Sequence, residues 1–284
     1  MRRLRYVICD VFSNKPLQGN PLAVFTDARG ASDELMQSLA RELNLSETTF
    51  ILPAEAGGDA RVRIFTPTRE MPFAGHPALG TAFVLAAPLQ RPLVRLETKS
   101  GIVPVRFELC GNQVSFGWMQ QPLPTVEAFA ASDTAALLEA LGGVTPILPV
   151  EVYDNGVRHA YVAVRTLDEV AQVKPDLARL AAFGPLGVNV FAGAAAQWKT
   201  RMFGPGLGVA EDPATGSAAG PLAVHLLRHG RLKADEEIVI QQGAELQRLS
   251  HIHAKVHGTA DNIELVEVGG AATIVARGEF IFPT

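Results

Sequence analysis

The chain contains the same pattern of potentially reactive residues twice. Residues 63–82 carry R-x-F-x-P, a turn and then H-P-A-x-G-T-A, and residues 201–218 carry R-x-F-x-P, a turn and then D-P-A-x-G-S-A. His76 and Asp212, which open the second part of each pattern, lie 136 residues apart, close to half of the 284-residue chain. We therefore predict one folding unit written twice, related by a pseudo-two-fold axis, with a site between the copies.

Each copy of the pattern predicts a strand, a turn and a helix that begins at a proline, Pro77 or Pro213. His76 and Asp212 would then be the N-cap residues. The free N–H groups of each first turn, together with the helix dipole, would form an anion site. If the halves face each other, both helix starts converge on one small carboxylate ligand. The competing interpretation is that His76 and Asp212 are structural caps or turn residues.

The pattern also places a hydroxyl in the first turns of each helix. Thr81 and Ser217 are either packing groups or ligand contacts, and their paired occurrence favours a ligand contact for Ser217.

One half of the chain has an acid that the other half lacks. Aligning Phe50 with Phe191 places Glu47 opposite Val188. When two halves share a scaffold and only one of them has an acid, that acid is a candidate for a single general acid/base. Few charges surround Glu47, so we expect its carboxyl to have a raised pKa and to take and return a proton near neutrality. The alternative is a solvated surface glutamate where a loop enters a strand.

The composition fits a two-domain α+β protein with a large core. Hydrophobic residues make up 48% of the chain, and alternating strand patterns are interspersed with helical ones. A proline-containing linker around residues 120–125 divides it into halves at 1–121 and 122–284, with the alternative that the last strand packs back on the first half. The motif helices contain many small residues, which predicts that a curled sheet encloses each of them.

Charge and hydropathy exclude several partners. The net charge of −4 and the scattered Lys and Arg residues provide no footprint for nucleic acid. No apolar stretch approaches the ~20 residues that span a bilayer, so we expect a soluble cytoplasmic protein. His251, His253 and His257 share a strand pattern without nearby Cys, Asp or Glu, which favours a solvated strand over a metal site. We therefore predict no metal.

Several longer segments resemble the phenazine biosynthesis PhzF-like family. The likeness covers almost the whole chain and extends to residues 155–159 and 191–194. The segments that carry it are Gln18–Phe25 (QGNPLAVF), Asn44–Phe50 (NLSETTF), Phe65–Pro67 (FTP), Pro72–Pro77 (PFAGHP) and Glu211–Gly220 (EDPATGSAAG).

This resemblance implies a diaminopimelate-epimerase-like fold, in which two similar halves each wrap a sheet around a central helix and a cleft between them holds the active site. It further implies cofactor-free isomerisation of trans-2,3-dihydro-3-hydroxyanthranilate, a homodimer, and a proton carried by Glu47. The residues that match the family's substrate contacts are Asn20, Gly75, His76, Asp212, Gly216 and Ser217.

Two other functions stay open. The chain could be an epimerase of another small acid, with Glu47 opposed by His76 or Asp212. The epimerase and racemase relatives use two cysteines, whereas Cys9 and Cys110 lie outside both motifs, which argues against a thiol pair. The chain could also be a non-catalytic protein that only binds aromatic acids.

Overall fold

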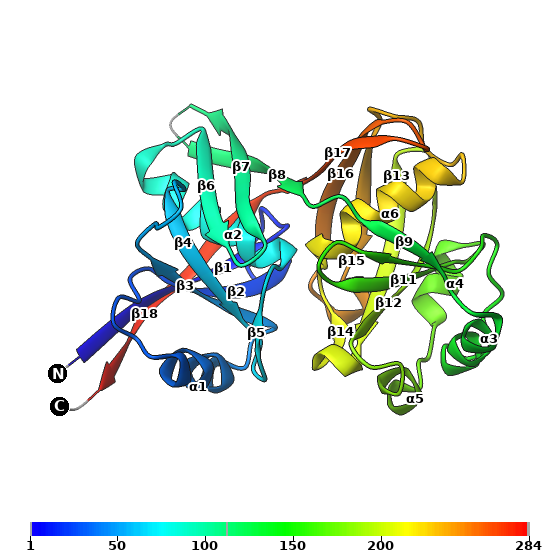
Figure 1. Cartoon of the computed structure of the whole chain (residues 1–284), viewed down its shortest axis with the longest axis horizontal. Helices are drawn as coiled ribbons and strands as arrows, with labels where there is room; N and C mark the ends of the chain where they lie inside the picture. The colour runs from blue at the N-terminus through cyan, green and yellow to red at the C-terminus, as the bar shows by residue number, and fades with distance from the viewer. Residues whose placement is uncertain (1, 112, 283–284) are drawn as a thin grey trace. The chain divides into compact units, whose positions relative to one another are not determined.

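A computed structural model describes residues 2–111 and 113–282 of the chain. The chain forms two compact α+β units (Figure 1). The first unit comprises the chain up to Gln120 together with the segment from Gly269 onward, and the second comprises Gln121–Val268. Each unit is described by itself below.

The first unit is built on a mixed sheet. β1 pairs antiparallel with both β18 and β2, so the two ends of the chain lie side by side in one unit (Figure 1). β2 and β3 are parallel, β3 and β4 antiparallel, β4 and β6 parallel, and β6–β7 and β7–β8 antiparallel. The elements are β1 (Arg2–Val11), β2 (Asn20–Phe25), α1 (Asp33–Leu43), β3 (Glu47–Leu52), β4 (Ala60–Phe65), β5 (Glu70–Met71), α2 (Gly75–Ala86), η1 (Ala87–Leu89), β6 (Leu93–Thr98), β7 (Gly101–Cys110), β8 (Gln113–Gln121) and β18 (Ala272–Phe282).

The second unit repeats this order of pairing. β10 and β11 are antiparallel, β11 and β12 parallel, β12 and β13 antiparallel, and β13 and β15 parallel. The elements are β9 (Thr125–Ala128), α3 (Ala131–Ala140), β10 (Glu151–Asp154), β11 (Arg158–Ala163), α4 (Leu167–Gln172), α5 (Leu177–Ala181), β12 (Leu186–Ala194), β13 (Gln197–Gly204), η2 (Pro205–Leu207), β14 (Val209–Asp212), α6 (Gly216–Arg228), β15 (Glu237–Gln242), η3 (Ala244–Leu246), β16 (Ser250–Gly258) and β17 (Ile263–Gly270), whose end crosses into the first unit.

The predicted repeat is therefore confirmed, but its alignment needs a correction. Arg63 lies opposite Phe50 in the β3–β4 pair, whereas Arg201 lies opposite Val190, not Phe191, in the β12–β13 pair. The alignment of the two phenylalanines is thus one residue out of step with the strands that carry the arginines.

The absence of a second acid survives this correction. Glu47 corresponds to Gly187 when the halves are matched through the arginine strands, and to Val188 when they are matched through the phenylalanines. Neither residue is ionisable, so Glu47 has no acidic counterpart in the second unit.

The repeated R-x-F segment is a structural clamp. Arg63 donates two hydrogen bonds to Glu70, at 2.8 and 2.7 Å, and its guanidinium lies 5.1 Å from the ring centre of Phe65. Arg201 does the same with Glu211, at 2.8 Å for both bonds, and with the ring of Phe203 at 4.9 Å. A bidentate ion pair with a stacked ring fixes a planar guanidinium in one orientation. The clamp therefore holds the short strand that leads into each motif helix.

The two motif helices are enclosed, as their small residues predict. Every residue of α2 is buried except Leu85, and α6 is buried from Gly216 to Leu227. A Cβ on Gly80 would lie 2.6 Å from Val11 Cγ2, and a Cβ on Gly220 would lie 2.3 Å from Gln121 Oε1. Each helix therefore approaches its surroundings so closely that only glycine fits.

Apolar clusters outside these helices complete the cores. In the first unit Phe25 and Phe50 stack with ring centres 4.7 Å apart, under α1. In the second unit α3, α4 and α5 cover a cluster rich in valine.

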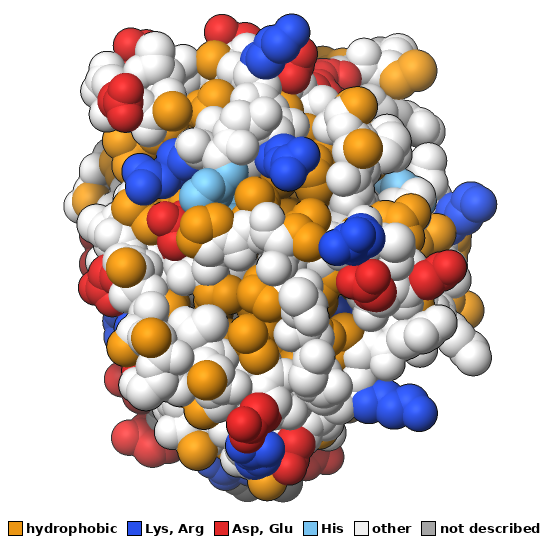
Figure 2. Space-filling model, turned by 90° about the vertical axis from the view of Figure 1, so that its right-hand side faces the viewer, with side chains coloured by type: hydrophobic (Ala, Val, Ile, Leu, Met, Phe, Trp, Pro, Cys, Tyr) orange, Lys and Arg blue, Asp and Glu red, His pale blue; other side chains and the backbone are white. Residues whose placement is uncertain are grey.

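The surface carries charges of both signs. Figure 2 shows basic and acidic side chains scattered among hydrophobic and other side chains, with both signs next to each other in several places on the face that it presents. Among the described residues, no helix combines the length and hydropathy needed to cross a bilayer.

We predict that Gly80→Ala lowers the free energy of unfolding by about 1–3 kcal/mol, because the new methyl group overpacks against Val11 and Leu22. Urea titration measures the effect. Ser132→Ala on the exposed face of α3 is the control and should change stability by less than about 0.5 kcal/mol. An unchanged or raised stability for Gly80→Ala would contradict the close packing of α2.

Candidate active site

The structure corrects the predicted helix starts. α2 begins at Gly75 with Ala74 as its N-cap, so His76 and Pro77 lie inside the first turn. α6 begins at Gly216 with Thr215 as its N-cap, so Asp212 is the last residue of β14 and not a cap. The N-cap roles predicted for His76 and Asp212 are therefore wrong. At neither helix does the N-cap side chain bond to the first turn.

Glu47, His76 and Asn20 come together in the first unit. Glu47 opens β3, and its side chain is 16% exposed. Its Oε2 lies 3.4 Å from Nε2 of His76, whose side chain is 4% exposed. On the other side of the imidazole, Asn20 Nδ2 lies 3.2 Å from His76 Nδ1. Glu47 is thus a partly exposed carboxyl beside a buried histidine.

The histidine in this group is neutral. Burial lowers the pKa of His76 to about 3. With Asn20 Nδ2 donating to Nδ1, the ring proton resides on Nε2 and faces the Glu47 carboxyl. His76 can therefore orient Glu47 through an N–H dipole, without the full positive charge that would hold Glu47 in its ionised form.

Asp212 belongs to a hydrogen-bonded turn in the second unit. Its Oδ2 accepts a 2.6 Å bond from Thr215 Oγ1. Gln242 of β15 donates to the Asp212 carbonyl at 2.8 Å and to Thr215 Oγ1 at 2.9 Å, and it accepts from the Thr215 N–H at 3.1 Å. These bonds hold residues 212–215 in a turn, which explains why α6 begins later than the proline predicts.

Ser217 lies in the first turn of α6 beside a second buried histidine. Ser217 Oγ is 3.1 Å from His159 Nε2, and Asn189 Nδ2 is 3.4 Å from His159 Nδ1. Burial lowers the pKa of His159 to about 3, so this imidazole is neutral as well. Ser217 is therefore held by a side chain of β11, which is held in turn by one of β12.

The start of α6 has a defect that other side chains repair. Pro221 lies inside the helix and has no N–H for the carbonyl of Ser217, four residues earlier. Asn155 Nδ2 donates to that carbonyl at 2.9 Å instead. Gln121 Nε2 donates to the Gly216 carbonyl at 2.7 Å. These bonds fix the backbone on which Gly216 and Ser217 are presented.

Sequence reasoning recognised some of these residues and missed others. Gln121, Asn189 and Gln242 were not predicted, because a buried amide has no spacing rule. His159 was noted only as part of a resemblance. The proline at position 221 inside a helical pattern could have predicted such a donor, because it leaves the carbonyl four residues earlier without a backbone N–H partner.

The Thr81 hydroxyl and the two cysteine thiols are not part of the candidate site. The Thr81 hydroxyl is fully buried and lies 2.8 Å from Thr49 Oγ1, so it is a packing group. Cys9 is buried in β1 and burial raises the pKa of its thiol to about 12, while Cys110 is exposed at the end of β7. Neither cysteine lies in a motif helix.

One group of described residues has the composition of a metal site. Ligand atoms of Glu151, His225 and His229 lie within 4.8 Å of one another. Glu151 Oε2 is 2.7 Å from the Tyr153 hydroxyl, 3.2 Å from His225 Nδ1 and 3.0 Å from His229 Nε2. These bonds, led by that of His225, lower the pKa of Glu151 to about 2. Because one carboxyl oxygen already faces these donors, we interpret the group as a hydrogen-bond network that holds α6.

The histidines of β16 have acidic neighbours from other segments. His253 Nδ1 is 2.7 Å from Glu237 Oε1, and His257 lies between Asp235 and Glu267 at 2.5 and 3.0 Å. The sequence pattern did not reveal these acids. We interpret these contacts as hydrogen bonds between side chains, and the prediction that the chain binds no metal stays a prediction.

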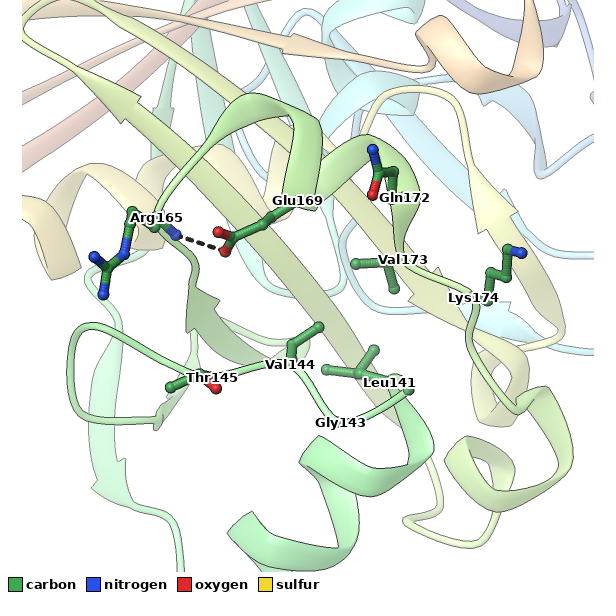
Figure 3. Close-up of a pocket in the computed structure, with 10 residues that line it drawn as sticks. Leu141, Gly143, Val144, Thr145, Arg165, Glu169, Gln172, Val173 and Lys174 are labelled. Atoms are coloured by element: carbon green, nitrogen blue, oxygen red, sulfur yellow. Dashed lines mark hydrogen bonds between the residues drawn. The ribbon is translucent and has the colours of Figure 1, made fainter.

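An open pocket of about 640 Å³ lies elsewhere in the second unit (Figure 3). Arg165 and Lys174 point in different directions at its two ends, and Glu169 accepts a 3.0 Å bond from the Arg165 backbone N–H. Its charged groups do not converge on a common point, so this pocket is not our candidate site.

Comparison with known proteins gives a consistent assignment. The family model described as "Phenazine biosynthesis-like protein" matches residues 9–278. A trans-2,3-dihydro-3-hydroxyanthranilate isomerase from Pseudomonas aeruginosa is 48% identical over 274 residues, which are 96% of this chain and 98% of the relative. A relative of the same name from Pseudomonas fluorescens is 45% identical, over 97% of this chain and 99% of its own length.

Solved structures agree on the fold. A phenazine biosynthesis protein of the PhzF family from Bacillus anthracis matches with a TM-score of 0.86 and 25% identity, over 99% of this chain and all of that one. A hydroxyproline epimerase from Agrobacterium vitis matches with a TM-score of 0.66 and 15% identity, over 99% of this chain and 91% of that one. The second likeness shows the fold alone, and together they confirm the expected epimerase-like architecture.

We predict that the protein loses stability as the pH falls from 7 to 5. The buried imidazoles of His76 and His159 have lowered pKa values in the folded state, and burial also lowers the pKa of His225. The unfolded chain binds protons at these residues below about pH 6.5, whereas the folded chain does not. The free energy of unfolding therefore keeps its full value above about pH 6.5. It falls between this pH and the folded-state pKa, by up to about 1.4 kcal/mol per pH unit for each histidine.

Urea titrations between pH 7 and 5, where most carboxyls are ionised in both states, measure this slope. His159→Gln should reduce it, whereas Ser132→Ala on the exposed face of α3, which removes no titratable group, should leave it unchanged. A stability that does not depend on pH in this range would contradict the assignment of neutral buried histidines.

Proposed function

The chain belongs to the phenazine biosynthesis-like family, and we propose that it is a cofactor-independent isomerase that acts on trans-2,3-dihydro-3-hydroxyanthranilate in phenazine biosynthesis. The relatives that are 45–48% identical over nearly the whole chain carry that activity in their names. The observation that carries the proposal to this chain's own residues is the carboxyl of Glu47 beside the neutral imidazole of His76.

In this proposal Glu47 is the single proton carrier. Its carboxylate removes a proton from one ring carbon as the electrons of that C–H bond enter the conjugated system. The carboxylic acid so formed returns the proton to another ring carbon, so a double bond migrates and no proton is gained or lost overall. A positioned base of this kind typically contributes about 10²- to 10⁴-fold in rate.

The neighbours of Glu47 suit a group that must exist in both protonation states. A protonated histidine at 3.4 Å would hold Glu47 ionised and make the return of the proton unfavourable. The neutral Nε2–H of His76 orients the carboxyl and imposes no full charge. Asn20 fixes this tautomer from behind, and Gly75 contributes the backbone at the start of α2.

The second unit supplies the proposed contacts to the substrate's carboxylate and amino groups. Ser217 presents a hydroxyl, Gly216 presents the backbone of the first turn of α6, and the helix dipole favours an anion there. Asp212 presents a buried carboxyl that can accept from an amino group. That both units serve one substrate stays a prediction of the repeat.

The thiol-based epimerase alternative is weaker than the isomerase. Cys9 is buried with a raised pKa and lies in β1, so it is not the thiolate that such a reaction needs. An epimerase that pairs Glu47 with another base would exchange one stereocentre with solvent and leave the double bonds in place.

The homodimer is expected from the resemblance, and the cytoplasmic location from the hydropathy of the sequence. A cytoplasmic homodimer is the expectation, and light scattering of the purified protein tests the dimer.

We predict that the wild-type protein in D₂O converts trans-2,3-dihydro-3-hydroxyanthranilate with migration of a double bond, as followed by proton NMR. Glu47→Gln keeps the size of the side chain and removes the proton carrier, so the rate should fall by about 10²-fold or more. Glu127→Gln, at an exposed acid of β9, is the matched control and should keep the wild-type rate.

The possible results separate the hypotheses. Unchanged substrate with the wild type would refute the isomerase proposal. Exchange at one carbon without double-bond migration would favour the epimerase. Full activity of Glu47→Gln would refute the proton shuttle, even if the isomerase activity itself is confirmed.

A further inference from the structure

A chain of three side chains behind Ser217 has a direction that its atoms determine. The amide of Asn189 donates from Nδ2 to the Ala160 carbonyl at 3.3 Å, and the same nitrogen faces His159 Nδ1 at 3.4 Å. An amide nitrogen has two protons, so it can serve both acceptors. Turning the amide over would place its oxygen against the Ala160 carbonyl oxygen, which is repulsive.

This orientation determines the tautomer of His159. Because Nδ1 accepts from Asn189, the ring proton of the neutral imidazole is on Nε2, which lies 3.1 Å from Ser217 Oγ. Nε2–H therefore donates to the serine oxygen, and the serine's own proton is left for another acceptor. This is the opposite of a serine activated as a nucleophile, in which the histidine would accept that proton.

The surrounding structure reserves space for this imidazole. A Cβ on Gly187 would lie 2.5 Å from His159 Nδ1, so any larger residue there would displace the ring. The Ser217 carbonyl is held by Asn155, which keeps the serine backbone in place. The three side chains therefore form an ordered relay of donors that points toward the first turn of α6.

We propose that His159 is a positioning residue that makes the Ser217 hydroxyl an obligate hydrogen-bond donor to an anionic oxygen of the ligand, and so selects a carboxylate at this position. The proposal deepens the isomerase proposal, on which it rests for the choice of ligand. A carboxylate presents two charged acceptor oxygens to the serine proton, whereas a carboxamide presents one neutral acceptor oxygen and an NH2 donor that the serine proton cannot satisfy.

The experiment measures binding of 3-hydroxyanthranilate, the aromatic analogue of the proposed substrate, and of its carboxamide by calorimetry. The wild type should bind the carboxylate about 10- to 100-fold more tightly, as expected for a hydrogen bond to a charged group. His159→Phe should remove most of this preference, and it should have no further effect in a Ser217→Ala background. His159→Gln, which retains an N–H donor, should restore part of it.

His225→Gln is the matched control, because it removes another buried histidine of the same unit that contacts Glu151 and not Ser217. The ratio of carboxylate to carboxamide affinity should be unchanged in this variant. In turnover, His159→Phe should raise KM more than it lowers kcat, because it weakens the grip on the carboxylate and leaves Glu47 intact.

Nitrogen NMR of the histidine rings in the wild type decides the tautomer without any variant. A bare Nδ1 and a protonated Nε2 on His159 support the proposal, and a proton on Nδ1 overturns it. Additive effects of His159→Phe and Ser217→Ala, or an unchanged affinity ratio in His159→Phe, also overturn it. If the wild type shows the expected tautomer and carboxylate preference but no isomerisation, the isomerase proposal fails and the positioning role stands.

Discussion

The enclosure of two helices is the constraint on which the rest of each unit depends. α2 and α6 are buried on nearly every side, and glycines inside them allow neighbouring strands to approach within contact distance. A polar group in such surroundings is costly unless it has a hydrogen-bond partner. Asn155 and Gln242 provide such partners at the start of α6, where their bonds involve the backbone.

The repeat shows how one scaffold acquires an asymmetric chemistry. The arginine clamps at Arg63 and Arg201 are almost identical in geometry, because both must hold the strand that leads into an enclosed helix. The positions that face the helix starts have diverged instead. Glu47 stands in one half where the other has an uncharged residue, and the Gly187 position makes room for the imidazole of His159. The two halves thus keep the same clamp geometry but differ in the residues near the helix starts, as expected when one fold is repeated and only one half has the proton carrier.

The sequence predicted the parts of this structure that depend on local pattern. The repeated motif and the enclosed helices follow from spacing and residue size. The start of α6 was predicted at Pro213 and lies at Gly216, because Gln242, distant in the chain, holds the intervening turn. The alignment of Phe50 with Phe191 was one residue out of step, because register depends on the partner strand. Residues such as Asn189, whose role is to orient another side chain, have no local signature.

The two units use the same device at their helix starts. In each, an asparagine amide faces Nδ1 of a buried histidine, which burial keeps neutral. Nε2 of that histidine faces a side chain that we propose acts on the substrate, Glu47 in one unit and Ser217 in the other. A charged histidine would favour the ionised form of a nearby carboxyl, and a freely rotating one would leave the serine proton undirected. Burial removes the charge, and the amide removes the choice of tautomer. Each neutral histidine therefore presents an oriented N–H group without a full positive charge. This suits both a carboxyl that must change protonation state and a hydroxyl that must only donate.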